Sequence, residues 1–140
     1  MLHLGEGYLL TSRVEDAHRL AEHALALFCD RKERGNQAWT LWLLGEIAVQ
    51  RQPSDTEQAE AHYRQALTLA QELGMRPLEA HCYRGLGTLY TKTGRREQAR
   101  VELTAAVELY RAMEMTFWLQ QTEATLAQGL HAIGSLEVSH

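Results

Sequence analysis

The chain of 140 residues contains three copies of one pattern, and this repetition constrains its fold more than any other feature. Each copy opens with a leucine–glycine pair, at Leu4-Gly5, Leu44-Gly45 and Leu86-Gly87. An alanine follows 12 to 14 residues after each glycine, and a second alanine lies seven residues later. The copies recur every 40 to 42 residues, and a partial fourth copy begins near Leu126. This period predicts an array of repeated supersecondary units.

The residues within each copy are typical of helices. Alanine and leucine together supply 40 residues, whereas valine, isoleucine and phenylalanine supply nine. In the second copy the apolar residues share one helical face: Ala59, Tyr63, Ala66, Leu67, Ala70 and Leu73. Ser12–Glu15 and Ser54–Glu57 have the spacing of capping boxes, while Gly35-Asn36 and Gly94 suit turns. We expect a short helix near 3–10 and longer ones over 14–33, 37–51, 55–73, 77–92, 96–113 and 117–132.

Charge, hydropathy and cysteine usage exclude several classes. The formal net charge of −4 argues against a nucleic-acid-binding surface, which needs an excess of basic residues. No apolar run approaches the roughly 20 residues that span a bilayer. Cys29 and Cys82 lack the spacing of a metal or redox site, and free thiols favour the reducing cytoplasm. We therefore expect a cytoplasmic protein without a cofactor, and neither nucleic acid nor a membrane as its partner.

The three copies resemble the tetratricopeptide repeat, whose pattern is Trp-x2-Leu-Gly-x2-Tyr followed by Ala-x3-Phe. The third copy carries the most complete match, with Tyr83, Leu86-Gly87, Tyr90, Ala99, Leu103 and Ala106. The period is similar to that of the long-period arrays in kinesin light chains, LGN-type scaffolds and bacterial regulators. The resemblance implies an all-α, right-handed superhelix of about three and a half helix-turn-helix repeats in one domain. The repeats would span 1–35 in part, 36–75, 76–115, and 116–140 in part.

The glycines and paired alanines of the pattern are predicted to pack helices together and not to bind a ligand. A glycine inside a helix costs about 0.5–1 kcal/mol relative to alanine, so it is tolerated where another helix passes closely. We therefore expect Gly87→Leu to overpack a helix pair and destabilise the array.

The resemblance also implies a binding surface, because the first helices of such repeats line a concave groove that holds a peptide or a partner helix. The aligned positions are Trp39, Trp42, Glu46 and Gln50, then His81, Arg84, Thr88 and Lys92, and finally Gln128 and His131. Large exposed aromatic residues are enriched at interfaces, although Trp39 would equally suit packing on the preceding repeat, whereas Trp42 suits an interface better. Arg84 and Lys92 suit an acidic ligand, whereas Glu46 favours a basic or mixed-charge one.

No constellation of residues points to an enzyme. The seven histidines are scattered without the spacing of a zinc site. His81 and Cys82 are adjacent, but neighbouring side chains diverge on a helix, whereas a nucleophile and its base must be in contact. We interpret the chain as a non-catalytic protein-interaction scaffold. The alternative is a spacer or self-association segment of a larger signalling protein. In that case the unfinished repeats at the two ends would expose apolar helix faces, through which two copies could form a homodimer.

Overall fold

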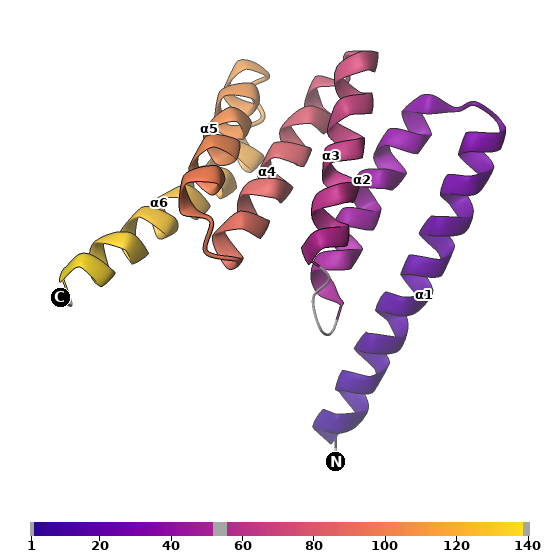
Figure 1. Ribbon diagram of the computed structural model, residues 1–140, viewed down its shortest axis with the longest axis horizontal. Helices are drawn as coiled ribbons and strands as arrows, with labels where there is room; N and C mark the ends of the chain where they lie inside the picture. Colours follow the sequence, from indigo (N-terminus) through magenta and orange to yellow (C-terminus); the bar gives the residue numbers. More distant parts are fainter. Residues whose placement is uncertain (1, 52–55, 139–140) are drawn as a thin grey trace. The chain divides into compact units, whose positions relative to one another are not determined.

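The computed structural model describes residues 2–51 and 56–138, and it describes the side chains of 13–51 and 56–128. The described residues form helices and turns without a strand. The helices are shown in Figure 1: α1 (Leu2–Asp30), α2 (Arg34–Gln50), α3 (Thr56–Leu73), α4 (Arg76–Lys92), α5 (Arg96–Ala112) and α6 (Thr116–Val138). They form two compact units, with the division between Gly74 and Met75.

In unit 1, helix α2 lies between α1 and α3 and packs against both. Ala21 on α1 meets Leu44 and Ile47 on α2, and the partly buried side chains of α1 around Leu25 enlarge this core. Arg51, just beyond α2, donates two hydrogen bonds of 3.0 Å to the two carboxylate oxygens of Glu15 on α1. This bidentate ion pair ties the end of α2 back to the middle of α1.

In unit 2, helix α5 packs against both α4 and α6. A core forms where Ala80 on α4 meets Ala106 and Tyr110 on α5, and Trp118 and Leu119 on α6 pack against it. Two aromatic residues and the small alanines therefore fix how the three helices meet.

The small residues of the repeat pattern lie where the sequence predicts them. Ala59, Ala66, Ala99 and Ala106 are all buried. At Gly87 an added Cβ atom would lie 2.5 Å from the Cγ atom of Leu103, so α4 and α5 touch at this glycine. The predicted packing role of these residues is confirmed, except that Leu73, at the end of its helix, is partly exposed.

Four of the turns share one backbone geometry, in which a residue in the left-handed region follows the helix end; the connection between α2 and α3 lies partly outside the described residues. The φ angles are 59° at Lys32, 69° at Gly74, 81° at Gly94 and 56° at Glu114. After Lys32, Gly94 and Glu114, the next backbone N–H donates to the carbonyl oxygen five residues back, at 2.9 Å each time. This is the Schellman pattern, so the predicted turn at Gly94 is confirmed.

Glu114→Gly should stabilise unit 2. Glutamate holds a φ of 56° only at a steric cost, whereas glycine adopts it freely and stands at the corresponding turn position 94. We expect the free energy of unfolding to rise by about 0.5–1 kcal/mol, measured by urea titration. Gly94→Ala should lower it by a similar amount, and equal stabilities of all three proteins would contradict the assignment.

The predicted break near Ser12 is wrong, because α1 is one continuous helix from Leu2 to Asp30. The residues from 11 to 14 include neither glycine nor proline, and Ser12 stands where the third copy has Gly94. Without a residue suited to a positive φ, continuing the helix keeps backbone hydrogen bonds that a capping box would only partly replace. The second predicted capping box begins at Ser54, outside the described residues, and α3 begins at Thr56.

The turn expected at Gly35-Asn36 is also misplaced, since Gly35 lies inside α2 and the turn comes three residues earlier, at Lys32. Local hydrogen bonds fix it there. The backbone N–H of Glu33 and the side-chain amide of Gln37 both donate to the carbonyl oxygen of Phe28, at 2.9 and 3.1 Å. The helices over 55–73, 77–92 and 96–113 are confirmed to within a residue, and α6 runs beyond the predicted 117–132 to Val138.

Candidate functional site

In unit 1 the candidate residues lie along one face of α2. Trp39 and Trp42 stand three residues apart, with ring centroids 5.9 Å apart and planes at 90°, which is an edge-to-face pair. Trp39 keeps 41% of its surface exposed, while Trp42 is half-buried. Glu46 is half-buried and Gln50 exposed one and two turns further along. The face is therefore aromatic at one end and polar at the other, and it lies opposite the buried side of α2 around Leu44.

In unit 2 the candidate residue Arg84 lies over an aromatic ring from another helix. Its guanidinium carbon is 4.5 Å from the ring centroid of Trp118 on α6, a cation–π contact. Phe117, 63% exposed, meets the same ring edge-to-face at 5.0 Å. No carboxylate pairs with Arg84 among the described side chains, and its buried Nε has no hydrogen-bond partner there. The guanidinium of Arg84 therefore lies on the half-buried ring of Trp118, next to the exposed ring of Phe117, without an ion-pair partner among the described side chains.

His81 lies on the same face of α4 as Arg84, but it is buried. Its Nδ1 atom forms a 2.6 Å hydrogen bond with the hydroxyl of Tyr110, and its ring meets that of Trp118 edge-to-face at 5.0 Å. Burial, and secondly the charge of Arg84, lower the pKa of His81 from 6.5 to about 4. At neutral pH His81 is thus neutral, and its buried ring packs against Trp118, the residue over whose ring Arg84 lies.

The other candidate residues differ in accessibility. Thr88 is half-buried and Lys92 exposed, one and two turns after Arg84 on α4. Gln128 is exposed on α6, and His131 belongs to that helix but its side chain lies outside the described residues. Arg84, Thr88 and Lys92 therefore form a stripe with two cations, while the described part of α6 adds neutral amides.

The contact between Arg84 and Trp118 was not predicted from the sequence. The two residues lie 34 positions apart on helices that share only a small contact. The repeat pattern identifies the exposed face of α4, but it does not say which residue of α6 covers that face. The exposure of Phe117 does agree with the apolar surface expected at the start of the last helix.

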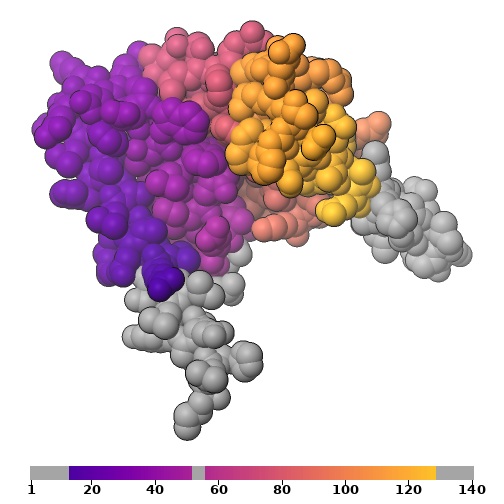
Figure 2. All heavy atoms as spheres, turned by 180° about the vertical axis from the view of Figure 1, so that it is seen from behind, coloured from indigo at the N-terminus to yellow at the C-terminus, as the bar shows by residue number. Residues whose placement is uncertain are grey.

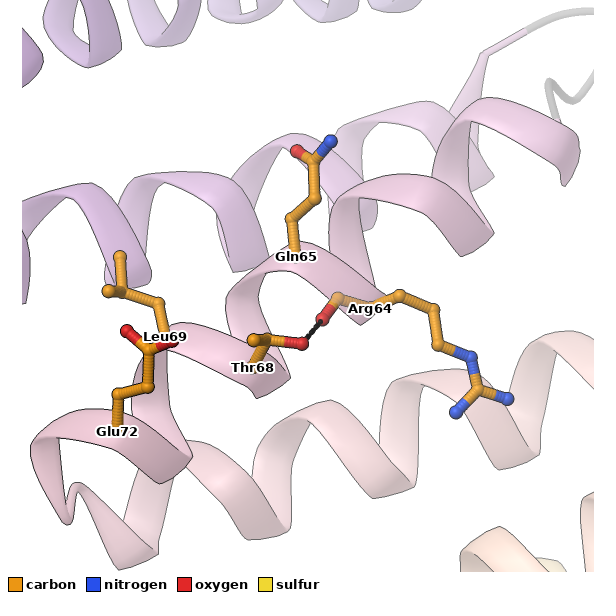
Figure 3. Close-up of a pocket in the computed structure, with 5 residues that line it drawn as sticks. All are labelled: Arg64, Gln65, Thr68, Leu69 and Glu72. Atoms are coloured by element: carbon orange, nitrogen blue, oxygen red, sulfur yellow. Dashed lines mark hydrogen bonds between the residues drawn. The ribbon is translucent and has the colours of Figure 1, made fainter.

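A shallow pocket that the sequence does not indicate lies on α3 in unit 1 (Figure 3). Its lining residues are Arg64, Gln65, Thr68, Leu69 and Glu72. Thr68 uses its hydroxyl to donate to the backbone carbonyl of Arg64 at 3.0 Å, and the carboxylate of Glu72 forms an ion pair with Arg34 on α2. The Thr68 hydroxyl and the Glu72 carboxylate therefore already have partners, and the pocket lies on an open helix surface, unlike an enclosed ligand site.

Among the described residues, no three histidine, cysteine or acidic side chains are grouped closely enough to hold a metal ion. None of the described helices combines the length and the apolar character needed to cross a bilayer.

Comparison with known proteins gives one family. A model of the tetratricopeptide repeat matches residues 37–112, which is more than half of the chain. The match begins in α2 and ends with α5, so it covers the helix pairs α2–α3 and α4–α5. No curated protein matches the sequence significantly.

Proposed function

Because this chain belongs to the tetratricopeptide repeat family, we propose that it is a non-catalytic scaffold that binds a peptide or a helix of a partner protein. Repeats of this family are generally protein–protein interaction modules. The proposal assigns binding to the exposed face of α2 in unit 1 and to that of α4 in unit 2. A cytoplasmic location is part of the same proposal, supported by the free thiols of Cys29 and Cys82.

The tryptophan pair on α2 is the observation that carries this proposal. Trp39 and Trp42 present a large, rigid apolar surface next to Glu46, on the side of α2 away from its core. Such residues lose little conformational freedom on binding and dominate interface energies. A pair held edge-to-face before binding is already organised for an apolar side chain of the partner.

The two faces differ in charge, and each belongs to its own unit. On α4, Arg84 and Lys92 offer cations that lack a carboxylate partner among the described side chains, whereas Glu46 on α2 offers an anion. Such charges steer association and select partners more than they add affinity. We therefore expect the α2 face to bind an apolar or aromatic anchor beside a basic residue, and the α4 face to bind an acidic segment.

Trp39→Ala combined with Trp42→Ala should abolish this binding. A peptide-display library selected on the wild-type chain supplies the probe, and isothermal titration measures the affinity of the selected peptide. We expect a loss of at least about 100-fold, because truncating a central aromatic residue costs about 2 kcal/mol or more.

Val101→Ala is the matched control, since Val101 on α5 is 66% exposed and lies on neither face. Its affinity should equal that of the wild type, and far-ultraviolet circular dichroism should show unchanged helicity in every variant. Peptides that bind the tryptophan-free variant as tightly as the wild type would refute the assignment of the α2 face. Failure to select any peptide would favour the alternative role as a spacer or self-association segment.

A further inference from the structure

Helix α1 has an exposed face, and this face takes no part in the peptide binding proposed for α2 and α4. Within unit 1, α1 packs against α2 and not against α3, so it lies at the edge of the unit (Figure 1). The indigo atoms of the helix form an outer side of this unit in the space-filling view (Figure 2). Much of the circumference of α1 is therefore open to a partner.

The residues on this open side form one continuous stripe along four turns. They recur at the spacing of a single helical face: Asp16, Leu20, His23, Ala24, Leu27 and Arg31. The side chain of Leu20 is 71% exposed and that of Leu27 is 41% exposed, while Ala24 between them is half-buried. We call these six residues the α1 stripe; it has an apolar middle, an acidic residue at one end and a basic residue at the other.

The α1 stripe is complementary to itself when two copies run antiparallel. Asp16 and Arg31 lie equally far from a point between His23 and Ala24, and so do Leu20 and Leu27. A two-fold axis through that point places each Asp16 against Arg31 of the other copy. The same axis places each Leu20 against Leu27 of the other copy. An isologous interface requires such self-complementarity.

The charged ends of the stripe are available for this pairing. The carboxylate of Asp16 forms an ion pair with Arg19 on its own helix, yet its side chain remains 58% exposed. Arg31 is exposed and has no ion-pair partner among the described side chains. Each Asp16 can therefore accept a second cation without giving up its own pair.

We propose that two copies of this chain associate through antiparallel pairing of the α1 stripe. The occupant is a second copy because an unrelated apolar helix would not match both the leucine spacing and the reversed order of charge. With two leucines per copy the interface is small, so we expect a dissociation constant between about 1 and 100 μM. The dimer presents the Trp39–Trp42 face of each copy outside the α1–α1 contact, since those residues lie on another helix.

Sedimentation equilibrium of the whole chain tests the association. The wild type should dimerise in the micromolar range, and Leu20→Ala with Leu27→Ala should weaken the dimer at least about tenfold. Val101→Ala, an equally exposed apolar change on α5, should leave it unchanged. A wild-type chain that stays monomeric up to about 300 μM would overturn the proposal, as would a dimer indifferent to the leucine changes.

A charge swap tests the direction of pairing. Asp16→Arg places cations opposite each other and Arg31→Asp places anions opposite each other, so either change alone should weaken the dimer. The double variant restores opposite charges and should regain most of the lost affinity, which a merely structural effect of either residue would not produce. Glu108→Arg, at an exposed position on α5, controls for the change in net charge. A double variant weaker than both single variants would overturn the antiparallel arrangement.

Cross-linking tests the register, in a Cys29→Ser background that removes the exposed native thiol. The two copies of residue 24 would be offset by only about 1.5 Å along the helix axis. Ala24→Cys should therefore form a disulfide-linked dimer on mild oxidation. The two copies of residue 20 would lie about 10 Å apart along the helix axis, so Leu20→Cys alone should not form a disulfide. A mixture of Leu20→Cys and Leu27→Cys chains should cross-link to each other. Efficient self-linking of Leu20→Cys would overturn the register.

Discussion

Gly87→Ala should destabilise unit 2, although alanine is the better helix former. The Cβ atom of alanine at this position would lie 2.5 and 2.6 Å from the Cγ and Cδ2 atoms of Leu103. Leu103 is buried, so its side chain cannot move aside freely. We expect the free energy of unfolding to fall by about 1–3 kcal/mol in urea titrations, and Gly87→Leu should cost more.

Gly35→Ala is the matched control for this prediction. Gly35 also lies inside a helix, but nothing approaches within 4 Å of the position that its Cβ would take. There the helix propensity of alanine should prevail, and stability should rise by about 0.5–1 kcal/mol. If both glycine variants shift stability in the same direction, close packing at Gly87 is not what decides its effect.

A double-mutant cycle identifies the contact responsible. Leu103→Ala alone should cost about 2–5 kcal/mol because it leaves a cavity. In Gly87→Ala with Leu103→Ala, the added methyl group enters the space that leucine vacates, so the double variant should lose less than the two single losses combined. Hydrogen exchange should place the loss in α4 and α5. Strict additivity would mean that Gly87 and Leu103 do not compete for the same space.

The repeat pattern predicts the packed side of each helix well. Spacing alone identified Ala59, Ala66, Ala99 and Ala106, all of which are buried, because each copy must solve the same packing problem. The family also follows from these residues, since the matching segment contains the two most complete copies. The long-period variety within the family stays a prediction.

Two predicted breaks failed, at Ser12 and at Gly35-Asn36, whereas the predicted break between 113 and 117 is confirmed although no glycine stands there. Gly94 marks its turn, but Lys32 and Glu114 adopt the same positive φ without being glycine or asparagine. Their turns are closed by local hydrogen bonds, as at the carbonyl oxygen of Phe28, and not marked by a residue type that favours a positive φ. Such positions cannot be recognised from residue propensity alone. The nearby Gly35 is a residue type expected at a turn, yet it lies inside α2.

The sequence also predicts the exposure of the candidate binding residues only in part. Alignment of the copies placed Trp39 and Lys92 on exposed surface. The same alignment selected His81, whose burial depends on Tyr110 and Trp118 arriving from two other helices. Periodicity assigns a residue to a helix face, but contacts over 29 to 37 positions decide whether that face is covered.

His81 should make unit 2 lose stability as the pH falls from 6.5 towards 4. Its pKa is lowered to about 4 in the folded chain, first by burial and then by Arg84, whereas the unfolded chain has the ordinary value of 6.5. Between these values the unfolded state binds a proton that the folded state refuses. The stability contributed by neutral His81 is therefore fully present above pH 6.5 and is lost progressively below it.

His81→Gln removes this titration while keeping an amide that can bond the hydroxyl of Tyr110. Between pH 7 and pH 5, the wild type should lose on the order of 1–3 kcal/mol more unfolding free energy than the variant. At pH 5 the Glu15 carboxylate contributes little to the difference, because its hydrogen bonds from Arg51 hold its pKa below 4.5. His62→Gln, on α3 of the other unit, controls for the loss of a histidine.

A nuclear magnetic resonance titration measures the pKa of the His81 ring directly, and the ring should remain neutral at pH 5.5. Arg84→Gln should raise the pKa of His81, because it removes the nearby positive charge, and should therefore reduce the stability that the chain loses on acidification. A wild-type chain whose stability falls with pH in parallel with His81→Gln would show that the ring is not held neutral by its burial. In that case the contact between His81 and Trp118 would be too loose to hold the Trp118 ring in place under Arg84.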